Sequence, residues 1–390
     1  MQQFDVVVVG GSISGTLAAI SAAERGLSVV LLERKKIPGE KVFCAEGISQ
    51  SSYHYFFEKN PRWISTEINQ VSLFSPSGRG VRIETPGAGY ILERRVMERD
   101  LWVIAAEKGA ELRCGVRVLD IGEWDGEGRE VVTSDGKVWG RIVVGADGIE
   151  SLTGRKTGLV RGLYPGEYHA TLQYFAYHPS IEEDTAELHA GPFAPGGYGW
   201  VFPKGKGYGW VGIGVDTAKK PGNLRDLLKE FIRKRFGNIK IIFISGGGVP
   251  TTPLRKRTTD GVILVGDAGR FAIPVSGGGI SHALYTGKLA GEVASEVLEK
   301  GPATAKRLSI FDKRWKREWG KEEKWYFIAK KIYMRMKDED FEILYDVVKK
   351  LFEGKKIREF HPFEAVERIL KASPHLLKLG KKLLGGYHGI

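Results

Sequence analysis

The hydrophobic pattern at the start of the chain predicts a strand, a helix and a second strand. The first apolar run ends at Val9 and is followed by a glycine turn. A helix of small residues is expected over about 14–25, and a second apolar run over 27–32 ends at Glu33. This order is typical of the first unit of a dinucleotide-binding fold, in which backbone N–H groups of the turn approach a pyrophosphate.

The glycine turn satisfies the pattern G-x-G-x-x-G at two of its three glycines. Gly10 and Gly15 hold the outer positions, and Ser12 holds the middle one. The Ser12 hydroxyl either binds the pyrophosphate or is merely tolerated, because a Cβ at this position crowds the approach. Glu33 stands where a carboxylate can bind an adenosine ribose hydroxyl. On this spacing alone, an ordinary βαβ unit that binds no nucleotide stays open.

The pattern changes twice further along the chain. The segment 34–47 is long and polar, which indicates a functional loop. Between 170 and 215 aromatic-rich strands alternate with glycine turns, which is typical of an antiparallel sheet. The remaining expected elements are strands near 71–74, 81–83, 89–92, 116–124, 130–133, 139–145, 239–245 and 261–265, helices over 95–108, 223–236 and 277–298, and a mostly helical region from 303.

Together these elements predict a mixed α/β fold (α+β) with a Rossmann-type nucleotide-binding domain, an inserted antiparallel-sheet domain and a C-terminal helical region. The expected boundaries are 1–70 with 89–160 and 250–300 for the first domain, 71–88 with 161–249 for the second, and 301–390 for the third.

Composition and charge narrow the class of protein. The net charge is 59 − 47 = +12, and residues 313–390 contribute 20 − 12 = +8 of it. This basic, aromatic-containing end fits either an anionic membrane surface or an ion-paired helical domain; no recognition motif for nucleic acid accompanies it. The chain has two cysteines, which fits a reducing interior, and neither a signal peptide nor a membrane-spanning run is apparent. We therefore expect a cytoplasmic protein, which would be peripheral on the inner face of the membrane if it binds lipid.

Three later fragments, each at the end of an expected strand, resemble FAD enzymes related to p-hydroxybenzoate hydroxylase. They are Tyr90–Glu98, which contains Arg94; Gly145-Ala146-Asp147-Gly148; and Gly266-Asp267-Ala268-Gly269 with Pro274 and Gly277–Ile280. The resemblance implies FAD as the cofactor. It also implies that the arginine reaches a phosphate or ribose, and that Asp267 accepts a hydrogen bond from a ribityl hydroxyl.

A fourth segment resembles the geranylgeranyl reductases. Pro195-Gly196-Gly197-Tyr198-Gly199-Trp200-Val201-Phe202-Pro203 is similar to their pattern P-x-x-Y-x-W-x-F-P at every fixed position, and Cys44-Ala45-Glu46-Gly47 is similar to their C-G-E-G loop, with alanine for the first glycine. The resemblance covers about residues 4–300. It implies flavin-dependent reduction of isoprenoid C=C bonds, either in archaeal-type membrane lipids or in prenyl diphosphates.

This resemblance assigns the candidate site residues. The residues expected to be catalytic are Cys44, Tyr198 and Trp200, and those expected to bind substrate are Tyr198, Trp200, Phe202 and Pro203. Two structural alternatives stay open: the aromatic residues of the strand could form a core stripe, and Cys44 could be a buried structural thiol. Residues expected at the cofactor are Gly10, Gly11, Ser12, Ser14, Gly15, Glu33, Arg34, Cys44, Ala45, Arg94, Val118, Asp147, Gly148, Gly266, Asp267, Pro274, Gly277, Gly278, Gly279 and Ile280. The histidines show no metal-ligand spacing, so no metal is expected.

Two other functions compete with prenyl reduction. A flavin monooxygenase or halogenase shares the fold, and Gly199–Pro203 is close to a halogenase motif, although Tyr198 and Phe202 depart from it. A non-catalytic prenyl carrier of the GDP-dissociation-inhibitor type would bind no flavin. The reductase interpretation requires a prenylated lipid or prenyl diphosphate and an electron donor, either a ferredoxin, a nicotinamide or another carrier.

Overall fold

A computed structural model describes residues 1–40, 42–357, 368–369, 371–375 and 378. The chain forms two compact units. Unit 1 contains 1–42, 93–164 and 249–323, and unit 2 contains 43–92, 165–248 and 324–390.

These units divide the chain differently from the three predicted domains. Residues 43–70 join unit 2 because β3 (Gly47–Ser49) and β4 (Ile64–Phe74) both pair with β5 (Gly80–Leu92). Residues 301–323 belong to unit 1, and the described residues from 324 belong to unit 2, so the described part of the C-terminal region is shared between the two units. The predicted helical structure beyond 357 lies largely outside the described residues.

Unit 1 is built on a sheet whose central strands are parallel. The order is β15 (Thr258–Thr259), β16 (Val262–Leu264), β9 (Gly136–Gly145), β1 (Gln2–Val9), β2 (Val29–Glu33) and β6 (Glu111–Cys114), with β7 (Val118–Ile121) and β8 (Arg129–Thr133) paired beside β9. Val7, Val30, Val143 and Leu264 from its strands lie in one core cluster. Strands buried on both faces, as here, are typical of a doubly wound sheet.

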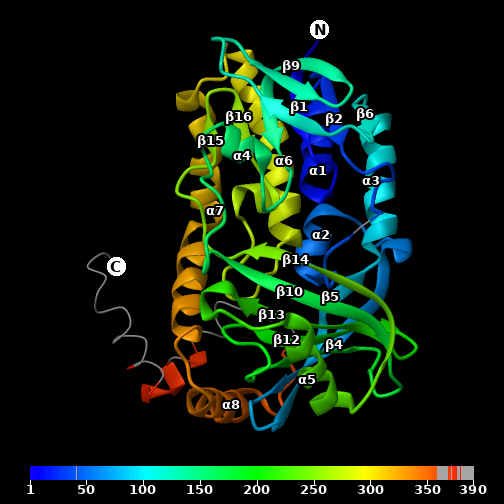
Figure 1. Ribbon diagram of the computed structural model, residues 1–390, viewed down its shortest axis with the longest axis vertical. Coiled ribbons are helices and arrows are strands. Elements are labelled where there is room, and N and C mark those ends of the chain that lie inside the picture. The colour runs from blue at the N-terminus through cyan, green and yellow to red at the C-terminus, as the bar shows by residue number, and fades with distance from the viewer. Residues whose placement is uncertain (41, 358–367, 370, 376–377, 379–390) are drawn as a thin grey trace. The chain divides into compact units, whose positions relative to one another are not determined.

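Helices α1 (Ile13–Ala23), α3 (Arg94–Glu107) and α6 (Ile280–Glu299) accompany these strands (Figure 1). All the residues of α1 are buried. It packs closely on α6, since a Cβ at Gly287 would lie 2.2 Å from the carbonyl oxygen of Ser14. The short helix α4 (Leu152–Lys156) and the first part of α7 (Ala305–Tyr333) complete the unit.

Unit 2 contains an eight-stranded sheet in the order β14 (Lys240–Pro250), β10 (Tyr168–Tyr177), β13 (Tyr208–Asp216), β12 (Tyr198–Gly205), β11 (Thr185–His189), β4, β5 and β3. The pairs β10–β13, β13–β12 and β12–β11 are antiparallel, as predicted for 170–215, whereas β11 pairs with β4 in parallel.

The two faces of this sheet carry different side chains. On one face, Tyr174, Val201 and Val211 pack with Phe231 of α5 (Leu224–Phe236) in an apolar core. The opposite face carries Tyr198, Trp200 and Phe202 at alternating positions of β12. We call the opposite face the aromatic face; Gln173 and Trp210 also belong to it, because they lie in register with the positions of Trp200 and Phe202.

Three further helices belong to unit 2. α8 (Asp338–Phe352) packs Tyr345, Val348 and Phe352 against Val81 and Ile83 of β5. The end of α7 contributes Lys330 and Tyr333. The short helix α2 (Gln50–Phe56) begins at Ser49, whose side chain accepts from the N–H of Ser52, and the sequence pattern did not predict it.

Candidate active site

In unit 1, the carboxyl ends of parallel strands bring three of the sequence fragments to one edge of the sheet. Val9 lies in register with Leu32 and with Gly145, and Gly145 lies in register with Leu264. The segments that follow these strands, at Gly10, Glu33, Asp147 and Gly266, therefore share that edge. This is the edge at which open α/β sheets bind ligands.

The outer glycines of the first turn are required by close backbone contacts. Gly10 has φ +102°, and a Cβ there would lie 2.4 Å from the carbonyl oxygen of Ala146. A Cβ at Gly15 would lie 1.8 Å from the carbonyl oxygen of Gly10. Neither position can accept a side chain without moving the backbone.

The middle position, Ser12, is conformationally ordinary. Its φ of −85° and ψ of −171° are accessible to any residue, and it precedes α1 without capping that helix through its side chain. Its hydroxyl donates to Glu98 Oε1 at 2.9 Å and accepts from Arg94 Nη2 at 3.1 Å. The serine hydroxyl is thus held by side chains of α3.

One face of α3 supports the whole glycine turn. Arg94, Glu98 and Trp102 follow one another at intervals of four residues, and such residues lie on the same side of a helix. Arg94 and Glu98 form a buried ion pair, and Trp102 Nε1 donates to the carbonyl of Gly11 at 2.7 Å. A Cβ at Gly11 would lie 2.2 Å from the Trp102 ring. Sequence reasoning missed Glu98 and Trp102, although their spacing from Arg94 was a usable signal.

Glu33 is a buried acceptor beside this turn. Its two carboxylate oxygens accept from the N–H of Gly11 at 2.7 Å and from that of Lys35 at 2.8 Å. A carboxylate has about four lone-pair sites, so both oxygens can still accept a ribose hydroxyl. The neighbouring Arg34 is exposed.

Asp267 is a second acceptor, on the turn after β16. Burial raises the pKa of its carboxyl to about 6, while the charge of Arg94 opposes that rise. Within the described part of the chain, its carboxylate makes no hydrogen bond to the protein. Gly279 precedes α6 with no side-chain cap, so the N–H groups of the first turn of this helix are not bonded to a capping side chain.

These groups fit FAD. Two helix N-termini without side-chain caps suit a pyrophosphate, and two buried carboxylates suit ribose and ribityl hydroxyls. Gly277 has φ +71°, and its N–H donates to Ile273 within the tight loop that also contains Pro274 and Gly278. This loop leads directly to Ile280, the first residue of α6.

Three other predicted cofactor residues have internal contacts. Asp147 accepts from Ser151 Oγ, Thr153 N and Thr153 Oγ1 at 2.6–3.0 Å, which anchors the start of α4. Ser14 lies beneath the turn after β16, because a Cβ at Gly266 would be 2.6 Å from its hydroxyl oxygen. Val118 begins β7 and pairs with Thr133. Gly148 has φ +80° and open space at its Cβ position, so only its backbone conformation favours glycine.

In unit 2, the aromatic face brings the predicted substrate residues together. The rings of Tyr198 and Trp200 lie 5.9 Å apart. Gly214 and Gly212 lie directly opposite them on β13, and a Cβ at Gly212 would lie 2.5 Å from the Trp200 ring. The Trp200 indole therefore lies against the backbone of β13, where a residue larger than glycine at position 212 would collide with the ring. Pro203, next along β12, points to the other face.

The Cys44 loop is fastened to the aromatic face by Gln173, a residue that sequence reasoning missed. Gln173 Nε2 donates to the carbonyl of Cys44 at 3.0 Å, and its Oε1 accepts from Trp200 Nε1 at 3.3 Å. The Cys44 side chain accepts from the N–H of Glu46 at 3.2 Å. Cys44 and Ala45 are both half-buried, and Phe202 lies near Gly47.

Glu46 is a buried carboxylate rather than a surface acid. Its Oε2 accepts from Lys204 Nζ at 2.9 Å and from Trp210 Nε1 at 2.8 Å. Lys204 also donates to the carbonyl of Leu92 at 2.6 Å. Glu46 holds φ +68°, which a non-glycine residue adopts only when its surroundings fix it.

Tyr198 carries a hydroxyl that stays protonated at neutral pH. Burial raises its pKa to about 12, and the proximity of Cys44 raises it further in the same direction. The Tyr198 hydroxyl therefore lies near Cys44 beside the aromatic face.

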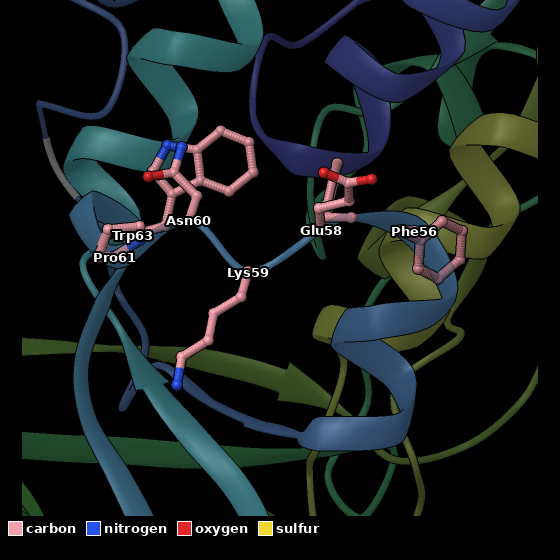
Figure 2. A pocket seen from close by; sticks show the side chains of 7 residues that line it. Phe56, Glu58, Lys59, Asn60, Pro61 and Trp63 are labelled. Carbon is pink, nitrogen blue, oxygen red and sulfur yellow. The ribbon is translucent and has the colours of Figure 1, made fainter.

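A surface hollow in unit 2 contains none of the predicted site residues. It is lined by the consecutive residues 56–61 and by Trp63, all from the connection between α2 and β4 (Figure 2). Lys59, whose side chain is labelled there, forms an exposed ion pair with Glu67. Because a single loop forms it, we assign this hollow no part in the site.

Comparison with known proteins agrees with the geometry of both units. The family model described as "Geranylgeranyl reductase catalytic domain" matches residues 167–249, and the one described as "FAD dependent oxidoreductase" matches residues 5–42. A solved geranylgeranyl bacteriochlorophyll reductase-like protein from Thermoplasma acidophilum has a TM-score of 0.91 at 28% identity, covering 98% of this chain and 100% of that one.

A flavin-dependent brominase gives a TM-score of 0.70 at 16% identity, covering 99% of this chain and 96% of that one, so it shows the shared fold alone. Among curated relatives, digeranylgeranylglycerophospholipid reductase 2 of Methanopyrus kandleri is 37% identical over 98% of this chain and 100% of its own length. The digeranylgeranylglycerophospholipid reductase of Methanosarcina acetivorans is 35% identical over 96% of this chain and 94% of its own length.

The predictions of an FAD cofactor, of a Rossmann-type fold with a substrate domain and of an oxidoreductase are confirmed, and the oxygenase and carrier alternatives are not favoured. The chain belongs to the digeranylgeranylglycerophospholipid reductase family of FAD-dependent oxidoreductases.

Proposed function

We propose that this protein saturates the C=C bonds of geranylgeranyl chains, carried by glycerophospholipids of the archaeal type or by prenyl diphosphates. The observation that carries the proposal is the aromatic face, where Tyr198 and Trp200 lie beside the Cys44 loop. Both aromatic residues belong to the region that matches the geranylgeranyl reductase model. A flat apolar surface with few polar groups suits an isoprenoid chain, which has no hydrogen-bonding groups of its own.

The residues that would hold FAD lie at the strand ends of unit 1. Glu33 would accept from the adenosine ribose and Asp267 from the ribityl chain, and the N-terminus of α1 would receive the pyrophosphate. Arg94 would stay on α3, bonded to Ser12 and Glu98, as a positive charge near these groups. When bound and reduced, FAD would supply the hydride, and an external reductant would supply the two electrons that each double bond consumes.

The chain's own residues would orient the alkene, exclude water and supply a proton. Trp200 and Phe202 would cover the prenyl chain, because an unactivated alkene reacts only when it is held against the hydride donor in a dry site. The Cys44 thiol and the Tyr198 hydroxyl would serve as the local proton reservoir. We give Cys44 the donor role because its loop is fixed by three side chains of the sheet.

The test compares turnover with flavin content. Cys44→Ala should reduce prenyl saturation about 100-fold, a typical contribution of a positioned acid, while the purified protein keeps its yellow FAD spectrum. Tyr198→Ala should lower turnover by weakening alkene placement, again with FAD retained. Loss of FAD from either variant would mean that these side chains serve the cofactor instead.

Docking on the anionic membrane that holds such lipids is part of the proposal. Among the described residues, no helix is long and apolar enough to cross a bilayer. Trp315 and Tyr326 of α7 are buried, so exposed lysines and arginines, rather than these aromatic rings, would contact the lipid surface. Sedimentation with phosphatidylglycerol vesicles should fall steeply between low and high salt. Absence of binding at low salt would refute docking.

A further inference from the structure

The Cys44 loop is held by more of the sheet than its sequence pattern indicates. Residues 43–46 connect Val42, the last residue of the first segment of unit 1, to strand β3 of unit 2. Side chains from three different positions of the sheet reach this short loop: Gln173 of β10, Lys204 of β12 and Trp210 of β13. None of the three belongs to the residues that the family resemblance singles out.

We propose that Gln173, Glu46, Lys204 and Trp210 form a positioning network that fixes the Cys44 sulfur relative to Tyr198 and Trp200. The inference rests on the proposed function, because it assigns supporting residues to the same site. In this network Glu46 is the central group: its carboxylate meets Lys204 and Trp210, and its backbone N–H reaches Cys44 Sγ.

Burial of these side chains restricts the network to one geometry. Glu46 is 4% exposed and Gln173 is 4% exposed, and the Lys204 side chain is 6% exposed. A buried carboxylate is tolerated only when it is paired and hydrogen-bonded, so Glu46 must keep the one orientation in which both donors reach it. Because Glu46 also has a left-handed backbone, the direction of its N–H toward the sulfur is fixed with it.

Gln173 connects the loop to the substrate residues. A single amide side chain accepts from Trp200 and donates to the Cys44 carbonyl, so the indole and the loop cannot move independently without breaking one of these bonds. Gly212 permits this contact, since a Cβ there would lie 2.5 Å from the Trp200 ring and 2.6 Å from Gln173 Cβ. The two hydrogen bonds set the spacing between the aromatic surface and the thiol loop.

The test uses thiol reactivity as well as turnover. Gln173→Met in the FAD-loaded protein removes both bonds at nearly constant volume. Cys44 should then react with iodoacetamide about tenfold faster, because the loop opens more easily when it has lost about one hydrogen bond. Mass spectrometry measures this alkylation relative to that of the exposed Cys114 in the same molecule. The kcat of prenyl reduction should fall about tenfold, with KM little changed.

Gln70→Met is the matched control. Gln70 lies on β4 of the same sheet, and its amide donates to Asp184 at 3.4 Å, outside the network. This variant should leave both the Cys44-to-Cys114 ratio and kcat unchanged. Trp210→Phe provides a milder second variant if Gln173→Met fails to fold, because it removes only the indole donor to Glu46 and keeps an aromatic ring.

Two outcomes separate this inference from the proposed function. An unchanged alkylation ratio in folded Gln173→Met and Trp210→Phe would overturn the positioning network, even if the wild-type protein reduces prenyl chains. A raised ratio in a wild-type background that reduces no prenyl chain would support the network and overturn the function.

Discussion

At the residue scale, Ser12 shows how a side chain replaces the usual middle glycine of the turn. Its hydroxyl donates to Glu98, which is 2% exposed, and accepts from Arg94. Ser12→Ala should lower the free energy of unfolding by about 1–2 kcal/mol, because a buried carboxylate loses a donor, while FAD still binds. Chemical denaturation and flavin titration measure the two quantities.

The exposed Ser51→Ala is the control for Ser12→Ala and should change stability by less than about 0.5 kcal/mol. An unaltered stability of Ser12→Ala together with lost FAD binding would show that the hydroxyl binds the cofactor instead of supporting Glu98.

His282 makes stability depend on pH. Burial lowers the pKa of its imidazole to about 4, although its bond to the Phe271 carbonyl opposes the shift. The unfolded chain therefore binds a proton below pH 6.5 that the folded chain binds only below about 4. The stability contributed by neutral His282 is present above pH 6.5 and is lost as the pH falls towards 4, by about 3 kcal/mol in total.

His282→Gln tests this contribution, because glutamine does not titrate and can still donate to a carbonyl. The difference in free energy of unfolding between the two proteins should shrink between pH 7 and pH 4. Comparing the two proteins also cancels the contribution of Asp267 to the free energy of unfolding, which changes with pH in the opposite direction because the pKa of its carboxyl is raised. A difference that stays constant with pH would contradict the assignment.

Residue identities at backbone-constrained positions could be predicted, whereas side-chain partners could not. Gly10, Gly15 and Glu33 follow from the spacing of a turn between two strands. The pairings of Gln173 with Cys44 and of Lys204 with Glu46 join residues more than a hundred positions apart, and a single sequence gives no periodic signal for them.

At the element scale, a hydrogen bond from the end of α7 holds the turn that leads into β12. Tyr333 donates to the carbonyl of Gly197 at 2.8 Å, next to Tyr198. Tyr333→Phe should lower the free energy of unfolding by about 1 kcal/mol and should also reduce turnover, because Tyr198 loses an anchor. Unfolding and steady-state assays measure the two effects.

Tyr345→Phe is its matched control, since Tyr345 of α8 donates in the same way to the carbonyl of Gly80 at 2.9 Å, on β5. It should cost similar stability and leave turnover unchanged. Equal loss of turnover in both variants would mean that α7 acts on activity only through overall stability.

Helices with a strong hydrophobic period could be predicted from the sequence, whereas strands whose limits depend on pairing with other strands were predicted less well. Helices α3 and α5 begin and end within a few residues of their expected bounds, because their apolar faces repeat with the helical period. Helix α1 also lies near its expected bounds, because it follows the glycine turn and precedes the second apolar run. The expected strands 81–83 and 89–92 are instead one strand, β5, which pairs with β4 on both sides of an irregularity between Glu84 and Gly89. The short α2 has too few residues for a periodic signal.

At the scale of the whole molecule, the sequence predicted the fold class, whereas the two compact units divide the chain at other positions than the expected domains. Two pairings place residues 43–70 in unit 2: the parallel pairing of β11 with β4, and the antiparallel pairing of β3 with β5. Both join segments that are distant in sequence, and hydrophobic patterning does not specify such partners. The same pairings bring the Cys44 loop into unit 2, with the aromatic residues predicted to act beside it.

Saturation of prenyl chains by this protein can be detected directly as a mass shift of the lipid. The FAD-loaded protein is incubated with dithionite and a geranylgeranylated glycerophospholipid extract, and the products are analysed by mass spectrometry. We expect a series of increments of about two daltons per double bond, which require both protein and FAD and disappear in Cys44→Ala. Unchanged masses on every prenyl chain, with FAD bound and reduced, would contradict the proposed function.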